Sequence, residues 1–203
     1  MSDLIYFDAQ AQSLLKTGVA KICDAVSSTM GPRGKLVLIE KQNEPPHLTK
    51  DGATVAKHIN LSDRVEALGA RLLRQASENT ATVAGDGSTT STVLAKEIYF
   101  KASQALQTGV GSPSELTSLI SEKSESIISF LKDKAKNVSS NEEIKQVATI
   151  SANGDDYIGK LISDAMSEVG SSGLVTVEKS KTTNTELNLV RGVKLSRGYI
   201  SPY

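Results

Sequence analysis

Apolar residues recur every three or four positions through most of residues 8–169, a spacing that places side chains on one face of a helix. Glycine, proline and short polar residues interrupt the pattern where helices end or begin. The pattern predicts helices at residues 8–29, 53–59, 63–79, 88–107, 113–135, 141–151 and 155–169. The spacing places Leu68 and Leu72 on one apolar side of one of these helices, and we expect Val93, Leu94 and Ile98 to face inward from another.

Two helix boundaries carry specific signals. Gly31 and Pro32 end the first helix, because glycine supplies a left-handed cap and proline cannot continue a helix. Ser112 and Glu115 have capping-box spacing, with Pro113 at the first helical position.

Runs of branched residues predict strands at 35–40 and 47–49, separated by a turn that contains two consecutive prolines. These strands would form a hairpin, and a lone hairpin is marginally stable, so we expect it to pair with something else. Residues 174–178 and 186–190 are also strand-like. The expected fold class is therefore mainly α with small β elements.

Composition and charge exclude several function classes. The 203 residues include 23 Lys plus Arg and 23 Asp plus Glu, so a basic excess for nucleic-acid binding is missing. Aromatic residues are 4% of the chain, with no Trp, which disfavours base stacking. No apolar run reaches the length of a membrane span, and the start resembles neither a secretory signal nor a transit peptide.

Cysteine and histidine are too scarce for a disulfide framework or for a metal cluster built from these two residue types. Cys23 is the single cysteine and there are two histidines, which excludes a disulfide framework and a cysteine-based zinc site. We expect Cys23 to be a buried small side chain rather than a reactive thiol. These counts favour a reducing, cytoplasmic location.

The stretch Gly85-Asp86-Gly87-Ser88-Thr89-Thr90 opens a strongly periodic helix. A helix N-terminus offers free amides and a positive dipole end, which suit phosphate oxygens, and glycine lets the backbone approach closely. A carboxylate in such a loop would repel a bare phosphate unless a cation such as Mg²⁺ lies between them. The alternative is an ordinary Ser/Thr cap after a glycine turn.

Two further glycine turns add to this pattern. Residues 29–34 could press against a flat or phosphorylated ligand, and Lys50-Asp51-Gly52 offers a cation and a second carboxylate. The alternative for Lys50 and Asp51 is an exposed turn with ordinary charges. Three such turns could converge on one nucleotide, although the pattern is not a P-loop, because no Gly-Lys-Ser/Thr follows the glycines.

The combination of these motifs resembles a known family. Five motifs occur in order: Thr-Met-Gly-Pro-Arg-Gly, Thr-Lys-Asp-Gly, Ala-Gly-Asp-Gly-Ser-Thr-Thr-Ser-Thr-Val-Leu-Ala, Thr-Ile-Ser-Ala-Asn and Arg-Gly-Tyr-Ile-Ser-Pro-Tyr. Together they resemble the N-terminal part of a group I chaperonin, the Hsp60/GroEL family, from the first helix to the last residue.

The resemblance implies ATP as the ligand and assigns roles to the residues of these turns. Asp86 would ligate Mg²⁺, Asp51 would position or activate the attacking water, and K⁺ is a second candidate ion. The residues implied to line the nucleotide or hold its phosphates are Thr29, Met30, Gly31, Pro32, Lys50, Asp86, Gly87, Ser88, Thr89 and Thr90. The chain has Ser88 where the family has threonine, and the family's principal catalytic aspartate has no counterpart in this sequence.

The resemblance also implies a domain organisation. Residues 1–133 would be the first part of the equatorial domain, 134–190 the ascending intermediate segment, and 191–203 the start of the apical domain. Gly192 would be a hinge. Tyr199 and Tyr203 would contact unfolded clients or a lid co-chaperonin; ordinary core packing is their alternative role. The lower hinge lacks the family's proline near Asn137.

The function implied is that of an ATP-dependent chaperone subunit that assembles into rings, typically of seven, and assists folding of non-native proteins. One alternative is a truncated, non-hydrolysing interaction protein. Another is a small phosphotransferase that uses Asp51 and Asp86, although no nucleophile–base pair is evident. We expect the 203 residues alone to be inactive as an ATPase.

Overall fold

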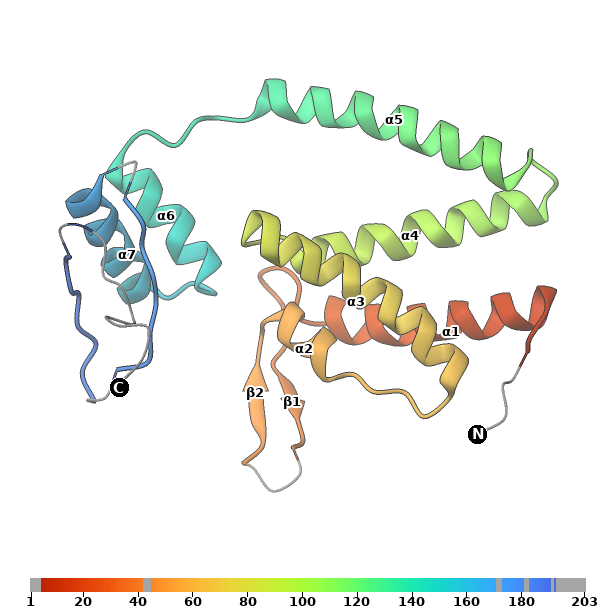
Figure 1. Cartoon of the computed structure of the whole chain (residues 1–203), viewed down its shortest axis with the longest axis horizontal. Coiled ribbons are helices and arrows are strands. Elements are labelled where there is room, and N and C mark those ends of the chain that lie inside the picture. Colours follow the sequence, from red (N-terminus) through yellow and green to blue (C-terminus); the bar gives the residue numbers. More distant parts are fainter. Residues whose placement is uncertain (1–4, 42–44, 171–172, 181–182, 191, 193–203) are drawn as a thin grey trace, which may run out of the picture. The chain divides into compact units, whose positions relative to one another are not determined.

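The computed structural model describes residues 5–41, 45–170, 173–180, 183–190 and 192. They form two compact units, Met1–Lys134 and Ala135–Tyr203. Figure 1 shows the elements α1 (Asp8–Ser27), β1 (Val37–Ile39), β2 (His47–Thr49), α2 (Gly52–His58), α3 (Arg64–Ala84), α4 (Ser88–Gln107), α5 (Pro113–Lys134), α6 (Asn141–Ser151) and α7 (Asp156–Val169). The expected fold class, mainly α with small β elements, is confirmed. In the described residues, no helix is both long and apolar enough to span a membrane.

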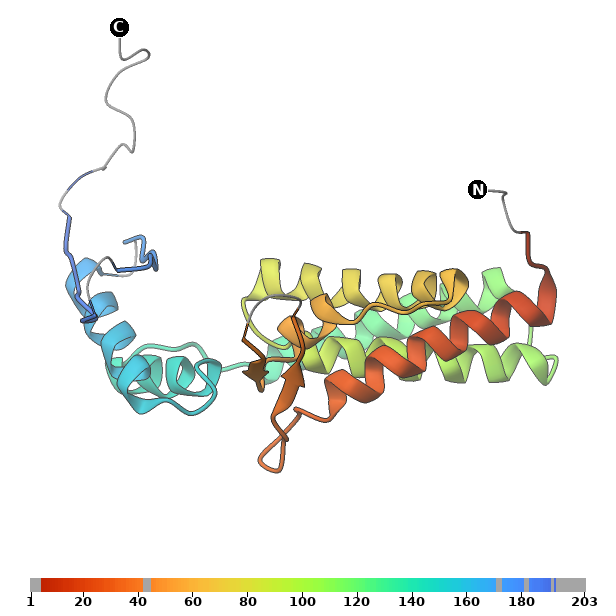
Figure 2. The same cartoon turned by 90° about the horizontal axis from the view of Figure 1, so that it is seen from below.

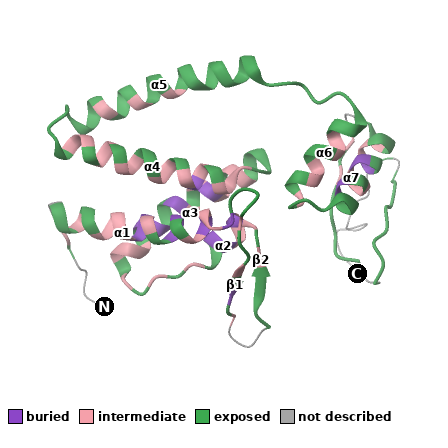
Figure 3. Cartoon of the chain, turned by 180° about the vertical axis from the view of Figure 1, so that it is seen from behind, coloured by how far each residue is buried: buried purple, intermediate pink, exposed green. Residues whose placement is uncertain are grey.

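The core of the first unit lies among α1, α2 and α3, with α4 packed alongside (Figures 2 and 3). Burial of apolar surface is the main force that holds these helices together. Cys23 is buried there as expected, and burial raises the pKa of its thiol, which keeps the thiol protonated at neutral pH. The fully or nearly buried apolar residues are Val19, Ile22, Cys23, Val26, Val55, Ala56, Ala70 and Leu73.

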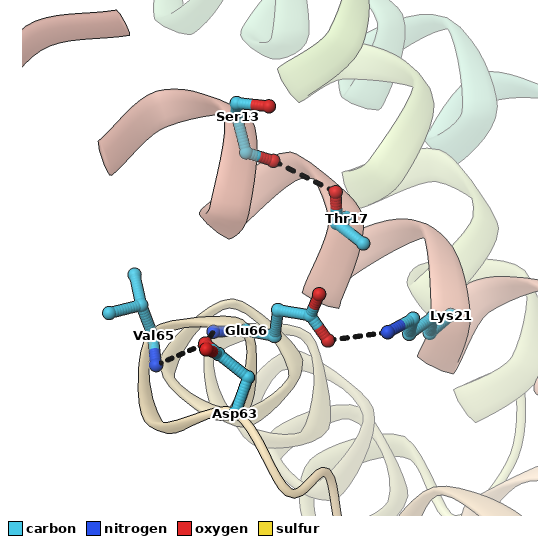
Figure 4. Close-up of polar contacts among 6 residues, drawn as sticks. All are labelled: Ser13, Thr17, Lys21, Asp63, Val65 and Glu66. Carbon is cyan, nitrogen blue, oxygen red and sulfur yellow. Dashed lines mark hydrogen bonds and ion pairs between the residues drawn. The ribbon is translucent and has the colours of Figure 1, made fainter. Parts of the chain in front are cut away.

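Helices α1 and α3 cross in backbone contact. A Cβ atom at Gly18 would overlap the backbone of Glu66, and one at Gly69 would overlap the carbonyl oxygen of Leu15. At the edge of this crossing, Lys21 Nζ lies 2.5 Å from Glu66 Oε2 (Figure 4). The Lys21 side chain is about half exposed, so the ion pair contributes little, about 0–1 kcal/mol. The close approach at the two glycines defines the crossing.

The predicted apolar side of α3 is not its most buried side. Leu68 and Leu72 are 48% and 62% exposed, whereas the buried side consists of Gly69, Ala70, Leu73 and Ser77. Gly69 lets the backbone of α3 approach α1 closely, and Leu68 and Leu72 stay largely exposed. Helix α3 also continues five residues past the predicted end, to Ala84, because no helix breaker precedes the left-handed Gly85.

The prediction that α4 faces inward with Leu94 and Ile98 is wrong, although Val93 from the same predicted set does pack against the core. Leu94 and Ile98 are 56% and 48% exposed, whereas Thr92 is fully buried. The Thr92 hydroxyl donates a hydrogen bond to the carbonyl oxygen of Ser88, which satisfies the hydroxyl inside the core.

The predicted start of α5 is confirmed. The Glu115 amide donates to Ser112 Oγ at 3.3 Å, and the Ser112 amide donates to Glu115 Oε2 at 2.8 Å. These hydrogen bonds lower the pKa of the Glu115 carboxyl. Along α5 itself no residue is buried, and Ile127 and Leu131 are more than half exposed.

The predicted hairpin is present but its first strand is shorter than expected. β1 and β2 pair antiparallel, with Leu38 opposite Leu48. Leu38 and Leu48 are 63% and 61% exposed, while Ile39 is buried on the other face. The hairpin projects from the end of the helices (Figure 1).

The second unit contains the antiparallel pair α6 and α7. A Cβ atom at Gly159 would overlap Thr149 Oγ1, and Ser163 Oγ donates to the carbonyl oxygen of Asn141 at 2.9 Å. The two predicted strands after α7 are absent: residues 173–180 and 183–190 form no sheet pairing, which an extended segment needs to become a strand. Gly192 has φ +108°, and Tyr199 and Tyr203 lie outside the described residues.

Candidate phosphate-binding site

The start of α4 carries no side-chain cap. Its N-cap is Gly87, in the left-handed conformation with φ +83°, whereas α2, α3, α6 and α7 begin at side-chain caps. An uncapped first turn presents its backbone amides and the positive end of the helix dipole to an outside acceptor. The expected alternative of a Ser/Thr cap is not what forms, because Ser88 is the first helical residue and not the N-cap.

Asp86 stands between two left-handed glycines at this helix start. Gly85 has φ +76° and Gly87 has φ +83°, conformations that side chains rarely tolerate. Asp86 is exposed, and its Oδ1 accepts a hydrogen bond from the Gly87 amide at 2.6 Å. The loop therefore holds a carboxylate next to the uncapped N-terminus of α4.

Asp51 is the N-cap of α2 and joins it to β2. Its carboxylate accepts hydrogen bonds from the amides of Ala53 and Thr54, at 3.1 and 3.0 Å, and from Thr54 Oγ1 at 2.6 Å. Its own amide donates to Thr49 Oγ1 at 3.0 Å. The preceding Lys50 is exposed.

Gly52 is the point where three elements meet. A Cβ atom there would overlap Thr89 Oγ1 in the first turn of α4, and would lie 3.1 Å from Val26 Cγ1 near the end of α1. Only glycine fits at this position without a shift of one element. The contact brings Asp51 and Thr89, which the sequence proposes as ligand-binding residues, to neighbouring positions.

Residues 29–34 fold into a tight turn directly after α1. Thr29 is buried and its Oγ1 donates to the carbonyl oxygen of Val26 at 2.8 Å. The Gly34 amide donates to the carbonyl oxygen of Gly31, which has φ +76°. Met30 and Pro32 are exposed. The turn thus begins near Val26, which lies close to Gly52, and its central residues are exposed to solvent.

The structure brings part of the predicted set together. The Gly52 contacts join the end of α1, the Asp51 cap and Thr89. Gly192 belongs to the other unit. Sequence reasoning did not single out Gly52 and Thr54 as functional residues; a glycine directly after an aspartate N-cap and a threonine three residues after it are the signals that point to them.

The donor set suits a divalent cation only together with a ligand. Within the residues that the structure describes, no cluster of three or more His, Cys, Asp or Glu side chains could hold a metal. Mg²⁺ is commonly held by one or two carboxylates plus phosphate oxygens. A single exposed carboxylate such as Asp86, next to an uncapped helix start, fits that pattern.

Comparison with known proteins identifies the class of protein to which the chain belongs. The mainly helical unit with its projecting hairpin is that of a chaperonin: residues 22–203 match the TCP-1/cpn60 chaperonin family. The chain belongs to this family, as its motifs predicted.

Two solved structures are similar to the chain. Both are of the chaperonin gp146 from the bacteriophage EL 2 (Pseudomonas aeruginosa), in the presence of ATP-BeFx. One crystal form has 30% identity and a TM-score of 0.62 over 77% of this chain; the other has 29% identity and a TM-score of 0.68 over 79%. The matched region is 27% and 28% of those chains, so this chain spans about a quarter of their length.

Proposed function

We propose that this chain belongs to an ATP-dependent chaperonin subunit and contributes most of the phosphate-binding side of its nucleotide site. The observation that carries the proposal is the uncapped start of α4, preceded by Gly-Asp-Gly and joined through Gly52 to the Asp51 cap. Family membership and the ATP-BeFx present with the similar phage chaperonin support a nucleotide as the ligand.

In this proposal, each turn has a separate task. The first-turn amides and hydroxyls of residues 87–90 hold phosphate oxygens, and residues 29–32 line the rest of the nucleotide. Lys50 supplies positive charge near the phosphates, and Asp51 orients the attacking water. Mg²⁺, when bound, neutralises phosphate charge, and Asp86 is the residue that would hold it; K⁺ is a second candidate ion.

The larger assembly is also proposed. Residues 1–133 belong to the equatorial domain, 134–190 to the intermediate domain and 191–203 to the start of the apical domain, with Gly192 as a hinge. The complete subunit forms a ring, heptameric as in the resembled family, and acts in the cytoplasm on non-native proteins. Tyr199 and Tyr203 contact clients or a lid co-chaperonin.

The deciding experiment measures ATP hydrolysis by a complete subunit that carries this chain. We expect Asp86→Ala to lower Mg²⁺-dependent turnover by about 100-fold or more, because phosphate charge is no longer neutralised. Asp51→Ala should lower turnover more than ATP affinity, since its task concerns the water. Asp133→Ala, an exposed carboxylate at the end of α5, is the matched control.

Normal turnover by the Asp86→Ala protein would contradict the metal role. ATP binding without any turnover in the unmodified protein would favour the alternative, a non-hydrolysing chaperonin-like interaction protein. The phosphotransferase alternative predicts transfer to an acceptor other than water.

A further inference from the structure

The Asp51 carboxylate accepts more hydrogen bonds than its role as a helix cap requires. The cap itself needs the amides of Ala53 and Thr54, which donate to Oδ1 and Oδ2 respectively. Thr54 Oγ1 adds a third bond to Oδ2, and at 2.6 Å it is the shortest of the three. The side chain of Thr54 therefore constrains an oxygen that the backbone already caps.

The three hydrogen bonds occupy most of the acceptor positions of the Asp51 carboxylate. A carboxylate offers about four lone-pair positions, two on each oxygen. The amide and hydroxyl of Thr54 occupy both positions on Oδ2, and the amide of Ala53 occupies one on Oδ1. Within the part of the chain that the structure describes, one acceptor position remains, on Oδ1, for a further donor.

Hydrogen bonds on both sides of Asp51 support this arrangement. Before it, the Asp51 amide donates to Thr49 Oγ1 at the end of β2. After it, α2 is only seven residues long, too short to be stable alone. The guanidinium of Arg74 holds the far end of α2 by donating to the carbonyl oxygens of Ala56 and Ile59.

We propose that Thr54 is a positioning residue for ATP hydrolysis: its hydroxyl fixes Asp51 Oδ2 and leaves Oδ1 to accept a hydrogen bond from the attacking water. The inference rests on the proposed function, in which Asp51 orients that water. In this role, Thr54 acts through its hydrogen bonds to Asp51 and not by contact with the reacting groups. A carboxylate held in one rotation presents the water in one orientation, and small misplacements of reacting groups lower the rate strongly.

The test compares three variants in a complete, assembled subunit. Thr54→Val keeps the branched shape and removes the hydroxyl, Thr54→Ser keeps the hydroxyl, and Asp51→Asn removes the charge of the positioned group. For Thr54→Val we expect kcat for ATP hydrolysis to fall about five- to tenfold with KM and ATP affinity unchanged. Thr54→Ser should restore kcat to within about twofold of the unmodified protein.

Thr117→Val is the matched control. Thr117 lies on α5, is exposed, and its hydroxyl donates to the carbonyl oxygen of Pro113 within the same helix. Thr117→Val also removes a threonine hydroxyl that is hydrogen-bonded near the start of a helix, but outside the candidate site, so kcat should stay unchanged.

The results for the variants distinguish failure of the positioning role of Thr54 from failure of the proposed role of Asp51. If Asp51→Asn abolishes turnover but Thr54→Val leaves kcat unchanged, the positioning role is wrong and the proposed function stands. If Thr54→Val lowers kcat together with the thermal midpoint, and Thr54→Ser restores neither, Thr54 is only structural and the inference is overturned. If Asp51→Asn retains full turnover, the proposed role of Asp51 fails and the positioning role fails with it.

Discussion

The packing of the candidate site depends on Gly52, because this residue has no side chain. A Cβ atom there would overlap Thr89 Oγ1 on α4 and would lie 3.1 Å from Val26 Cγ1 on α1, so its absence lets the start of α2 approach both helices. The sequence around it, Asp-Gly-Ala-Thr, is compatible with any short helix start. The close contact, and not the local conformation, makes glycine necessary here.

We expect Gly52→Ala to lower the free energy of unfolding of the chain by about 1–3 kcal/mol, because the added methyl group overlaps Thr89. Urea denaturation measures this loss. Thr89→Ala removes the overlapping oxygen, so the double variant should lose less than the sum of the two single losses. Additive losses would show that the two residues are not in contact.

At the scale of single elements, the N-terminus of α6 is stabilised by hydrogen bonds between residues that are close in sequence. Glu143 Oε2 accepts hydrogen bonds from the amides of Ser139 and Ser140, at 3.0 and 3.1 Å, and these lower the pKa of the Glu143 carboxyl. The folded-state pKa thus lies below the unfolded one. The stabilisation is present above the ordinary glutamate range and is lost as pH falls through the lowered value.

NMR titration tests this directly. The amide proton shifts of Ser139 and Ser140 should titrate together, with a midpoint below the ordinary glutamate value of about 4.3. In Glu143→Gln these shifts should no longer titrate in that range. A midpoint at or above the ordinary value would contradict the hydrogen bonds described here.

The hairpin has an exposed apolar face that lacks a partner within the described residues. Leu38 and Leu48 face each other across the strands and are both more than half exposed. A two-stranded sheet of three residues each is marginal alone, so we expect it to add to a neighbouring subunit.

The paired change Leu38→Lys with Leu48→Glu keeps a favourable cross-strand pair and removes the apolar face. In a complete subunit we expect the folded state to persist while the ring dissociates to monomers, as measured by light scattering. Lys35→Glu, just before β1, is the charge-changing control. An intact ring in the paired variant would exclude the hairpin as an assembly contact.

At the scale of the whole molecule, apolar surface remains uncovered along α5. Ile127, Phe130 and Leu131 are each nearly 60% exposed. Soluble monomers rarely expose contiguous apolar surface of more than a few hundred Å². In the proposed complete subunit, further chain covers this surface.

We therefore expect residues 1–203, expressed alone, to associate, to bind a hydrophobic dye and to lack chaperonin-like ATP turnover. Size-exclusion chromatography with light scattering and an ATPase assay measure these properties. A monomer that unfolds cooperatively and hydrolyses ATP would contradict this and would favour a self-sufficient small ATPase.

The sequence alone predicted the order of the helices and most of their bounds. Helices α4 and α6 have the predicted limits, and the α5 capping box forms as expected, because periodicity, caps and turns are interactions within a few residues. The family was also recognisable, since its motifs are continuous in sequence. The roles of the site residues stay predictions.

Only the tertiary structure decided which helix faces are buried and which turns meet. Leu94 was expected inside and Leu68 on the apolar side of α3, because both are large and apolar, yet α3 buries Gly69 and Ser77, and α4 buries Thr92. Helices that approach closely select small side chains, and that selection depends on a partner far along the chain. For the same reason, the meeting of Gly52 with Thr89 is invisible in the sequence: it joins two locally ordinary helix starts through a steric contact that exists only once the helices have packed.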